Sequence, residues 1–99
     1  MTNKSPVVYI MANQSRTTYV GVTSDLFTRV WQHKYKSKPD SFTGRYNINK
    51  LVYFAEFARV DDAIAFEKKL KGKDRAFKLA LIEDKNPRWN DLAWNWFED

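Results

Sequence analysis

The chain of 99 residues has no cysteine, which excludes disulfide bonds, thiolate zinc sites and cysteine nucleophiles. Glycine and proline are scarce, with three of each, and the sequence contains no repeats, low-complexity tracts or linkers. No apolar run approaches the length of a membrane span, and Met1–Val8 lacks the apolar core of a signal peptide. We therefore expect one cytoplasmic domain over residues 1–99 that does not associate with membranes.

Aromatic residues and positive charge are abundant instead. Aromatic side chains make up 16% of the chain, which provides core volume and also rings for stacking. The formal net charge is +5, and lysine and arginine are concentrated in residues 34–50 and 68–78. Such a distribution attracts nucleic acid, although lysine-rich helices are often simply solvated. The candidate contacts to nucleic acid are Lys34, Lys36, Arg45, Lys68 and Lys71.

The pattern of apolar and turn residues predicts an α+β fold in the order β-β-α-β-α-α, a small three-stranded antiparallel sheet flanked by helices. The predicted strands are Pro6–Ala12, Thr17–Val22 and Leu51–Phe57. The predicted helices are residues 25–36, Val60–Leu70 and Asp74–Glu83. Residues 36–49 are polar and are expected to form a functional surface loop. The core covers residues 6–92, and the aromatic tail, Asp91–Phe97, is expected to be helical.

The ends and faces of these elements carry further predictions. The first helix is expected to begin with Ser24 or Thr23 as its N-cap. The side chains that it is expected to bury are Leu26, Phe27, Val30 and Trp31. Gly72 is expected to end the second helix as a C-cap, and Gly21 within a strand indicates a close backbone approach or a bulge.

Glu67 has the most unusual position, because it lies in the middle of the apolar face of its helix. The apolar residues on both sides of it, at 100° per residue, are Val60, Ala63, Ile64, Phe66 and Leu70. A carboxylate buried there without a partner costs several kcal/mol, roughly the stability of a whole domain. Either a cation meets Glu67, or Glu67 faces a cleft that water and ions enter. A single carboxylate in such a cleft suits one Mg²⁺ or Mn²⁺ ion, weakly held without substrate.

Four other polar side chains favour the cleft. Tyr9 and Tyr19 lie in adjacent strands, where cross-strand geometry can bring both phenols to one face; the alternative is that they fill the edge of the core. Arg29 and His33 are spaced i, i+4 and so lie on one side of the first helix. Arginine is suited to holding a phosphate, and histidine can transfer or orient a proton. The alternatives are a structural histidine and a salt bridge from Arg29 to Glu67.

Several blocks of the sequence keep a common register. Val7-Val8-Tyr9 precedes Tyr19-Val20-Gly21 by ten residues. The blocks that follow are Thr23–Leu26 with Arg29 and His33, Ser41–Thr43 with Tyr46 and Asn47, Leu51–Tyr53, Glu67-Lys68 and Asn86–Leu92. Together they resemble the GIY-YIG nuclease superfamily in its compact single-domain branch. The chain departs from that pattern at Val7, where the family has glycine, and at Phe66, where branch members often carry a basic residue.

This resemblance implies a divalent-metal-dependent endonuclease that hydrolyses DNA phosphodiester bonds. Tyr9 corresponds to the residue that activates the attacking water, and Tyr19 is a second phenol beside it. Arg29 would hold the scissile phosphate, and His33 would handle or orient a proton. The remaining implied positions are Glu67 as the ligand of the Mg²⁺ or Mn²⁺ ion, with Gly21 and Asn90 in supporting places.

The resemblance also raises the question of how DNA is selected. Such nucleases generally take their target from an attached DNA-reading domain, and 99 residues leave no room for one. The expected activity is therefore structure-selective or dependent on a protein partner that supplies targeting. Binding of RNA as well as DNA is left open. The alternative function is a non-catalytic module on the same fold that binds nucleic acid or another protein.

Overall fold

The protein is built on a three-stranded antiparallel sheet with the strand order β2-β1-β3. The computed structural model describes residues 5–35 and 41–97. In chain order the elements are β1 (Val7–Ala12), β2 (Thr18–Thr23), α1 (Leu26–Lys34), α2 (Phe42–Arg45), β3 (Lys50–Glu56), α3 (Val60–Gly72) and α4 (Arg75–Lys85). The predicted α+β fold and the order β-β-α-β-α-α are confirmed, with α2 as one extra helical turn inside the expected loop.

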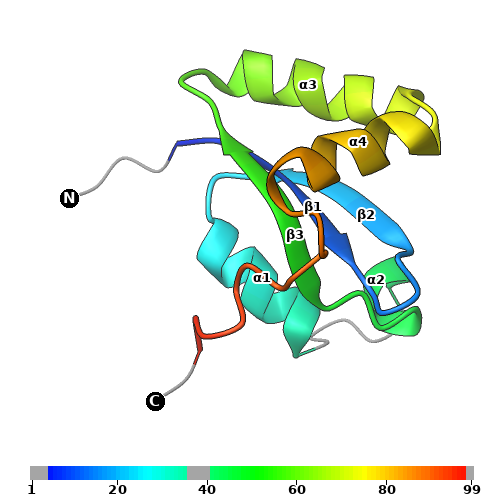
Figure 1. Cartoon of the computed structure of the whole chain (residues 1–99). Coiled ribbons are helices and arrows are strands. Elements are labelled where there is room, and N and C mark those ends of the chain that lie inside the picture. Colours follow the sequence, from blue (N-terminus) through cyan, green and yellow to red (C-terminus); the bar gives the residue numbers. More distant parts are fainter. Residues whose placement is uncertain (1–4, 36–40, 98–99) are drawn as a thin grey trace.

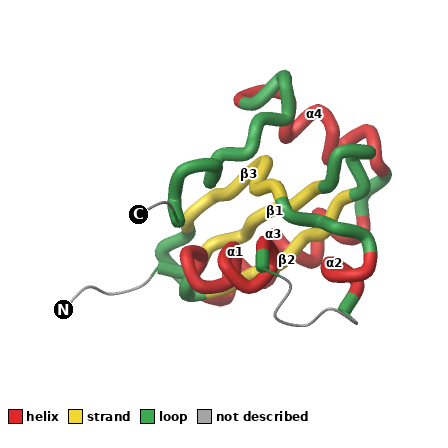
Figure 2. Tube along the Cα trace, turned by 90° about the horizontal axis from the view of Figure 1, so that it is seen from below, coloured by secondary structure: helices red, strands yellow, loops and turns green. Residues whose placement is uncertain are grey.

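The sheet has a helical layer on each face. Figure 1 shows α3 and α4 above the sheet and α1 below it. In Figure 2 the same strands lie side by side with β1 in the middle. All six residues of β1 are buried, because both of its faces are covered, and a strand buried in this way reads as a continuous apolar run.

The alternation of side chains along β1 divides the core into two clusters. Val8, Ile10 and Ala12 face α3 and α4, where they pack with Ala63 and Leu70, among others. On the opposite face Tyr9 and Met11 pack with Val30 of α1 and with Ile48 and Leu51. The sheet therefore separates the tyrosine layer from the layer that carries α3. Within the described residues, no helix is long and apolar enough to cross a lipid bilayer.

The helix ends differ from the sequence predictions. The N-cap of α1 is Asp25, whose carboxylate accepts a hydrogen bond from the backbone N–H of Thr28, so the predicted cap at Ser24 or Thr23 is wrong. The Thr23 hydroxyl instead accepts from the N–H of Asp25 at 2.9 Å and supports the cap. Gly72 is not a left-handed C-cap, because it is the last residue of α3 and Lys73 follows in an extended conformation.

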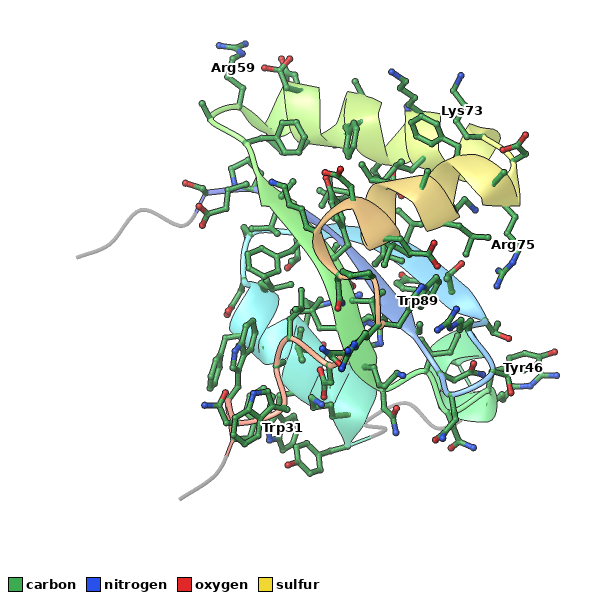
Figure 3. The ribbon with its side chains drawn as sticks, in the orientation of Figure 1. Trp31, Tyr46, Arg59, Lys73, Arg75 and Trp89 are labelled. Atoms are coloured by element: carbon green, nitrogen blue, oxygen red, sulfur yellow. The ribbon has the colours of Figure 1, made fainter. Side chains whose placement is uncertain are left out.

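The aromatic tail is not helical, contrary to the prediction. Residues 92–97 form successive turns, because the carboxylate of Asp91 accepts from the backbone N–H groups of Leu51 and Ala93 and fastens the chain to β3. The predicted burial of Phe27 and Trp31 is also wrong: they are 54% and 46% exposed. Phe27 stacks on Trp96 with ring centroids 6.1 Å apart, and Figure 3 shows Trp31 on the side of α1 away from the sheet.

Candidate active site

A hydrogen bond between Tyr9 and His33 joins β1 to α1. Tyr9 has no exposed surface, and its hydroxyl lies 3.0 Å from Nε2 of His33. His33 is buried near the last turn of α1. A buried phenol costs free energy unless it is hydrogen-bonded, so this pairing fixes the position of the helix on the central strand.

Burial determines the protonation of both partners. It raises the pKa of Tyr9 to about 12, although the neighbouring Arg29 acts in the opposite direction. Burial also lowers the pKa of His33 to about 4, and the positive charge of Arg29 adds to this effect. At neutral pH the phenol is therefore protonated and the imidazole is neutral. Which of the two groups donates depends on the imidazole tautomer: with the ring hydrogen on Nδ1, the Tyr9 hydroxyl donates to Nε2.

Tyr19 and Arg29 complete a compact cluster around this hydrogen bond. The ring centroid of Tyr19 lies 5.3 Å from that of His33 and 6.2 Å from that of Tyr9. Interaction with the Tyr9 hydroxyl raises the pKa of Arg29, which lies one helical turn before His33. Among the described residues, the buried Nε of Arg29 has no hydrogen-bond partner. The structure thus brings together four of the predicted site residues, and one of them has unused hydrogen-bonding capacity.

Gly21 gives the Tyr9 ring its space. The two residues are directly opposed in the register of β1 and β2. A Cβ atom placed on Gly21 would lie 2.6 Å from the phenolic oxygen of Tyr9. The close approach expected at Gly21 is therefore present, whereas the irregularity of the sheet falls between Ile10 and Met11, opposite β3.

Glu67 belongs to the other layer of the molecule. It lies between Ala63 and Leu70 on the buried face of α3, and its side chain is 12% exposed. Its Oε2 lies 2.5 Å from Nζ of Lys71 in the next turn, so the cation that meets this carboxylate is Lys71, not Arg29. No described contact joins Glu67 to Tyr9 or to its neighbours. Within residues 5–35 and 41–97, no group of three or more histidine or acidic side chains is placed to hold a metal ion.

The other predicted positions have varied surroundings. Lys34 is largely buried, because it forms an ion pair with Asp91 and donates to the carbonyl of Asn49. Arg45 and Lys68 are exposed, and Lys36 lies outside the described residues. Asn90 is exposed, and no described contact links it to the tyrosine cluster.

Asn86 is a structural residue that the sequence reasoning did not single out. Its side-chain amide donates to the carbonyl groups of Val52 and Asn90, and its side-chain oxygen accepts from the N–H of Asn90. It is buried, and it holds the segment after α4 against β3. The Asn-Pro sequence at residues 86–87 could have indicated this structural role, because asparagine side chains commonly form hydrogen bonds with backbone groups at turns.

The arrangement of the tyrosines, arginine and histidine on a β-β-α-β-α-α scaffold agrees with a family comparison. A sequence model of the GIY-YIG catalytic domain matches residues 5–80. The chain belongs to the GIY-YIG family. This is a nuclease family, and the resemblance seen in the sequence is confirmed.

Similar proteins extend the GIY-YIG assignment over most of the chain. A UPF0213 protein in the VLF1-GP41 intergenic region of Autographa californica nuclear polyhedrosis virus is 33% identical over 85 residues, which are 85% of this chain and 82% of the viral protein. The solution NMR structure of a UPF0213 protein from Bacillus halodurans has a TM-score of 0.57 and 23% identity. That likeness covers 92% of this chain and 97% of the bacterial one, and it shows a shared fold.

Replacement of Gly21 tests how tightly the GIY-YIG tyrosine is packed. Gly21→Ala forces the buried Tyr9 ring to move, so we expect a loss of about 1–3 kcal/mol in the free energy of unfolding. Gly72→Ala is the matched control, because a Cβ there meets nothing within 4 Å and should stabilise α3 by about 0.5–1 kcal/mol. Urea unfolding of both variants measures the two effects. Equal stabilities would contradict the close packing of Tyr9 on Gly21.

The neutral His33 predicts a pH dependence of stability. Its pKa is near 6.5 in the unfolded chain and about 4 in the folded domain, so the unfolded state binds the proton first as the pH falls. The contribution of His33 to the free energy of unfolding is about 3 kcal/mol. It is fully present above pH 6.5 and is lost as the pH falls from 6.5 to 4. We would measure the free energy of unfolding across this pH range for the parent protein and for His33→Gln. The comparison separates the effect of His33 from that of the other titrating groups. The difference between the two proteins should change with pH, and a constant difference would refute the buried neutral imidazole.

Proposed function

We propose that the protein is a divalent-metal-dependent endonuclease that hydrolyses DNA phosphodiester bonds and selects its substrate by structure or through a partner. The observation that carries this proposal is the cluster of Tyr9, Tyr19, Arg29 and His33, in which a guanidinium with an unused N–H lies beside two phenols. Membership of a nuclease family supports the same chemistry.

Arg29 is the group that would bind the scissile phosphate. Its guanidinium presents several N–H donors in a plane that matches phosphate oxygens. A buried donor without a partner costs about 1–3 kcal/mol, which a phosphate oxygen would offset after a small movement of the side chain. The positive charge would then stabilise the additional negative charge that develops on phosphorus during attack by water.

Tyr9 and His33 provide a path for the proton of the attacking water. A phenol with a pKa of about 12 is a poor base alone, but its hydroxyl lies 3.0 Å from Nε2 of His33, which can take its proton when the ring hydrogen is on Nδ1. Tyr9 has no exposed surface, so a side chain of the cluster would have to move to admit water. Tyr9 could then accept a proton from that water while it passes its own proton to the imidazole. Burial lowers the pKa of His33 and the charge of Arg29 adds to this effect, so an anionic phosphate on Arg29 would offset the second part of the shift. His33 thus becomes a better acceptor when substrate is bound.

Glu67 is the residue that would hold the metal ion. One carboxylate, with water and phosphate oxygens in the other positions, is a donor set that Mg²⁺ or Mn²⁺ accepts. The bound ion would supply charge neutralisation at the phosphate. Lys71 would have to leave the carboxylate, and its side chain is 53% exposed and can turn into solvent. The helix α3 packs on the edge strand β2. Side chains from both layers could therefore reach DNA that lies along that edge.

The metal role can be tested by removing one charge. Glu67→Gln should lower Mn²⁺-dependent nicking of plasmid and flap DNA by at least about 100-fold and leave DNA binding largely intact, because the lost interaction acts mainly on the transition state. Asp62→Asn is the matched control, an exposed acid on the same helix whose loss should leave nicking unchanged.

Three outcomes are informative. Equal cleavage by Glu67→Gln and the parent protein would refute the metal role. Absence of turnover by the parent on plasmid, flap and single-stranded substrates, with firm binding retained, would favour the non-catalytic alternative. Restoration of activity in Glu67→Gln by higher Mn²⁺ concentrations would show that the carboxylate sets metal affinity.

DNA affinity should also depend steeply on salt. Each phosphate contact made by a lysine or arginine adds about 0.9 to the slope of log K against log salt concentration. Replacement of Lys68 by alanine should reduce that slope by about one, whereas Asp62→Asn should not. Fluorescence anisotropy across a salt series, without metal, measures both slopes. A binding constant that does not change with ionic strength would rule out contacts between the basic side chains of residues 68–78 and phosphates.

A further inference from the structure

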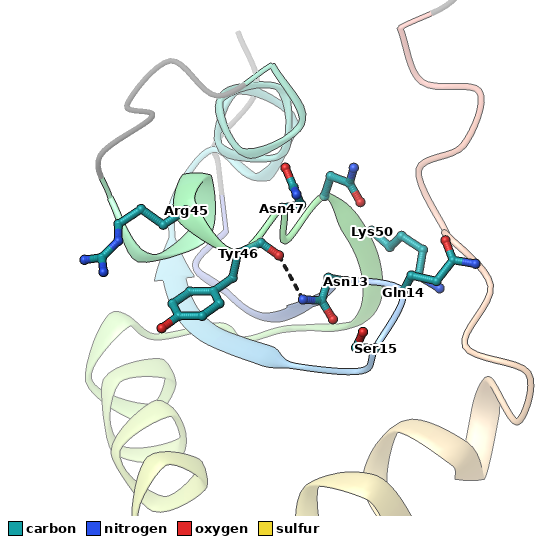
Figure 4. A pocket seen from close by; sticks show the side chains of 8 residues that line it. Asn13, Gln14, Ser15, Arg45, Tyr46, Asn47 and Lys50 are labelled. Atoms are coloured by element: carbon teal, nitrogen blue, oxygen red, sulfur yellow. Dashed lines mark hydrogen bonds between the residues drawn. The ribbon is translucent and has the colours of Figure 1, made fainter.

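A polar trough lies beside α2, separate from the tyrosine cluster. Its larger part is a hollow of about 510 Å³ whose lining includes Asn13, Arg45, Tyr46, Asn47, Asn49 and Lys50. A second hollow of about 330 Å³ is lined by Lys34, Tyr35 and Asp91, together with the same Asn49 and Lys50. The two hollows are neighbours that share Asn49 and Lys50, and together they are called the trough here. Figure 4 shows the larger part, with Asn13 next to Tyr46.

The lining suits a ligand that combines negative charge with polar ring edges. Arg45 and Lys50 provide positive charge, and no described residue that lines the larger hollow is a carboxylate. The asparagine side chains both donate and accept hydrogen bonds, as base edges require. In the smaller hollow the carboxylate of Asp91 is already bound by Lys34 and by the backbone N–H of Leu51.

A partly exposed tyrosine lines each hollow. Tyr46 lines the larger hollow and is 48% exposed. Tyr35 lines the smaller one and is 56% exposed, but its ring already packs against Trp31 and Phe97. Aromatic rings of this kind are platforms on which unpaired bases stack, next to a groove that tracks the backbone. Bases within a duplex are stacked on each other and do not present their faces in this way.

The trough is held in place by hydrogen bonds and by the core. The side-chain amide of Asn13 donates to the carbonyl of Tyr46 at 2.8 Å, and its oxygen accepts from Thr17 N–H at 2.9 Å, which joins the β1–β2 turn to α2. Asn47 has a positive φ of 55°, and the next residue, Ile48, is fully buried in the cluster that contains Tyr9. The backbone that follows Asn47 therefore enters the core layer that contains Tyr9.

We infer that this trough binds an unpaired strand of DNA, with a base stacked on Tyr46 and the backbone held by Arg45 and Lys50. The inference rests on the proposed nuclease function and narrows its substrate to DNA with a single-stranded branch. The trough would position that branch while the adjoining phosphate occupies Arg29. Two lining residues are chain neighbours of the tyrosine layer, because Lys34 follows His33 and Asn47 precedes Ile48.

The test is equilibrium binding of the full chain to a fluorescein-labelled single-stranded 12-mer and to the matching duplex, in EDTA at fixed salt. Tyr46→Ala should weaken binding of the single strand by about tenfold, whereas Tyr46→Phe, which keeps the ring, should bind as the parent does. Lys50→Ala should also weaken it, and Lys85→Ala on α4 is the control for loss of one charge. Circular dichroism melting verifies that each variant is folded.

The outcomes separate this inference from the proposed function. Parent-like binding of the single strand by Tyr46→Ala and Lys50→Ala overturns the trough, whatever the nuclease assay shows. Equal losses for single strand and duplex also overturn it, because they indicate general contacts with phosphate. Selective loss for the single strand supports the trough even if the parent protein cleaves nothing, in which case the nuclease function alone fails.

Discussion

The hydrogen bond between the Tyr9 hydroxyl and His33 constrains the geometry of its whole layer. A phenol without exposed surface needs an acceptor, and a histidine can be that acceptor only while Nε2 is unprotonated. Burial and the nearby guanidinium of Arg29 both favour the neutral imidazole. Gly21 is required in turn, because any side chain there would occupy the space of the phenol. The neutral imidazole of His33 and the glycine at position 21 are therefore both needed to bury the phenol of Tyr9.

The sheet separates this cluster from Glu67, and that separation shapes how a reaction could proceed. Tyr9 faces α1, whereas Glu67 lies on α3 among residues of the other core cluster, with Lys71 as its ion-pair partner. In the proposed mechanism the tyrosine layer provides the arginine that holds the scissile phosphate, and the α3 layer provides the carboxylate that holds the metal ion. In the proposed mechanism they would act on one phosphate at the β2 edge. The substrate would thus contribute the missing link between the layers, which is consistent with weak metal affinity in its absence.

Sequence patterns predicted the sheet, the helix order and the semi-buried position of Glu67, because these depend on local periodicity. The sequence patterns gave wrong predictions where the structure depends on contacts between segments that are far apart in the sequence. Phe27 and Trp31 lie in an apolar stretch, but Arg29 and His33 take part of the sheet-facing side of α1 and leave those rings outside. The tail lacks a helix because one Asp91 carboxylate binds two backbone N–H groups. The Lys71 partner of Glu67 is i+4, yet the sequence alone allowed Arg29 equally well.

In the proposed mechanism, electrostatic coupling within the cluster would let a weak base serve. In the protein without substrate, burial disfavours a proton on His33 and the guanidinium adds to this effect, while burial keeps the phenol protonated. A phosphate on Arg29 cancels that repulsion and adds its own attraction for a protonated imidazole. The same binding event would therefore position the bond to be cleaved and increase the proton affinity of the group that drives attack. In the proposed mechanism the site would gain basicity when the reacting phosphate is in place, which would favour proton transfer to His33 at neutral pH.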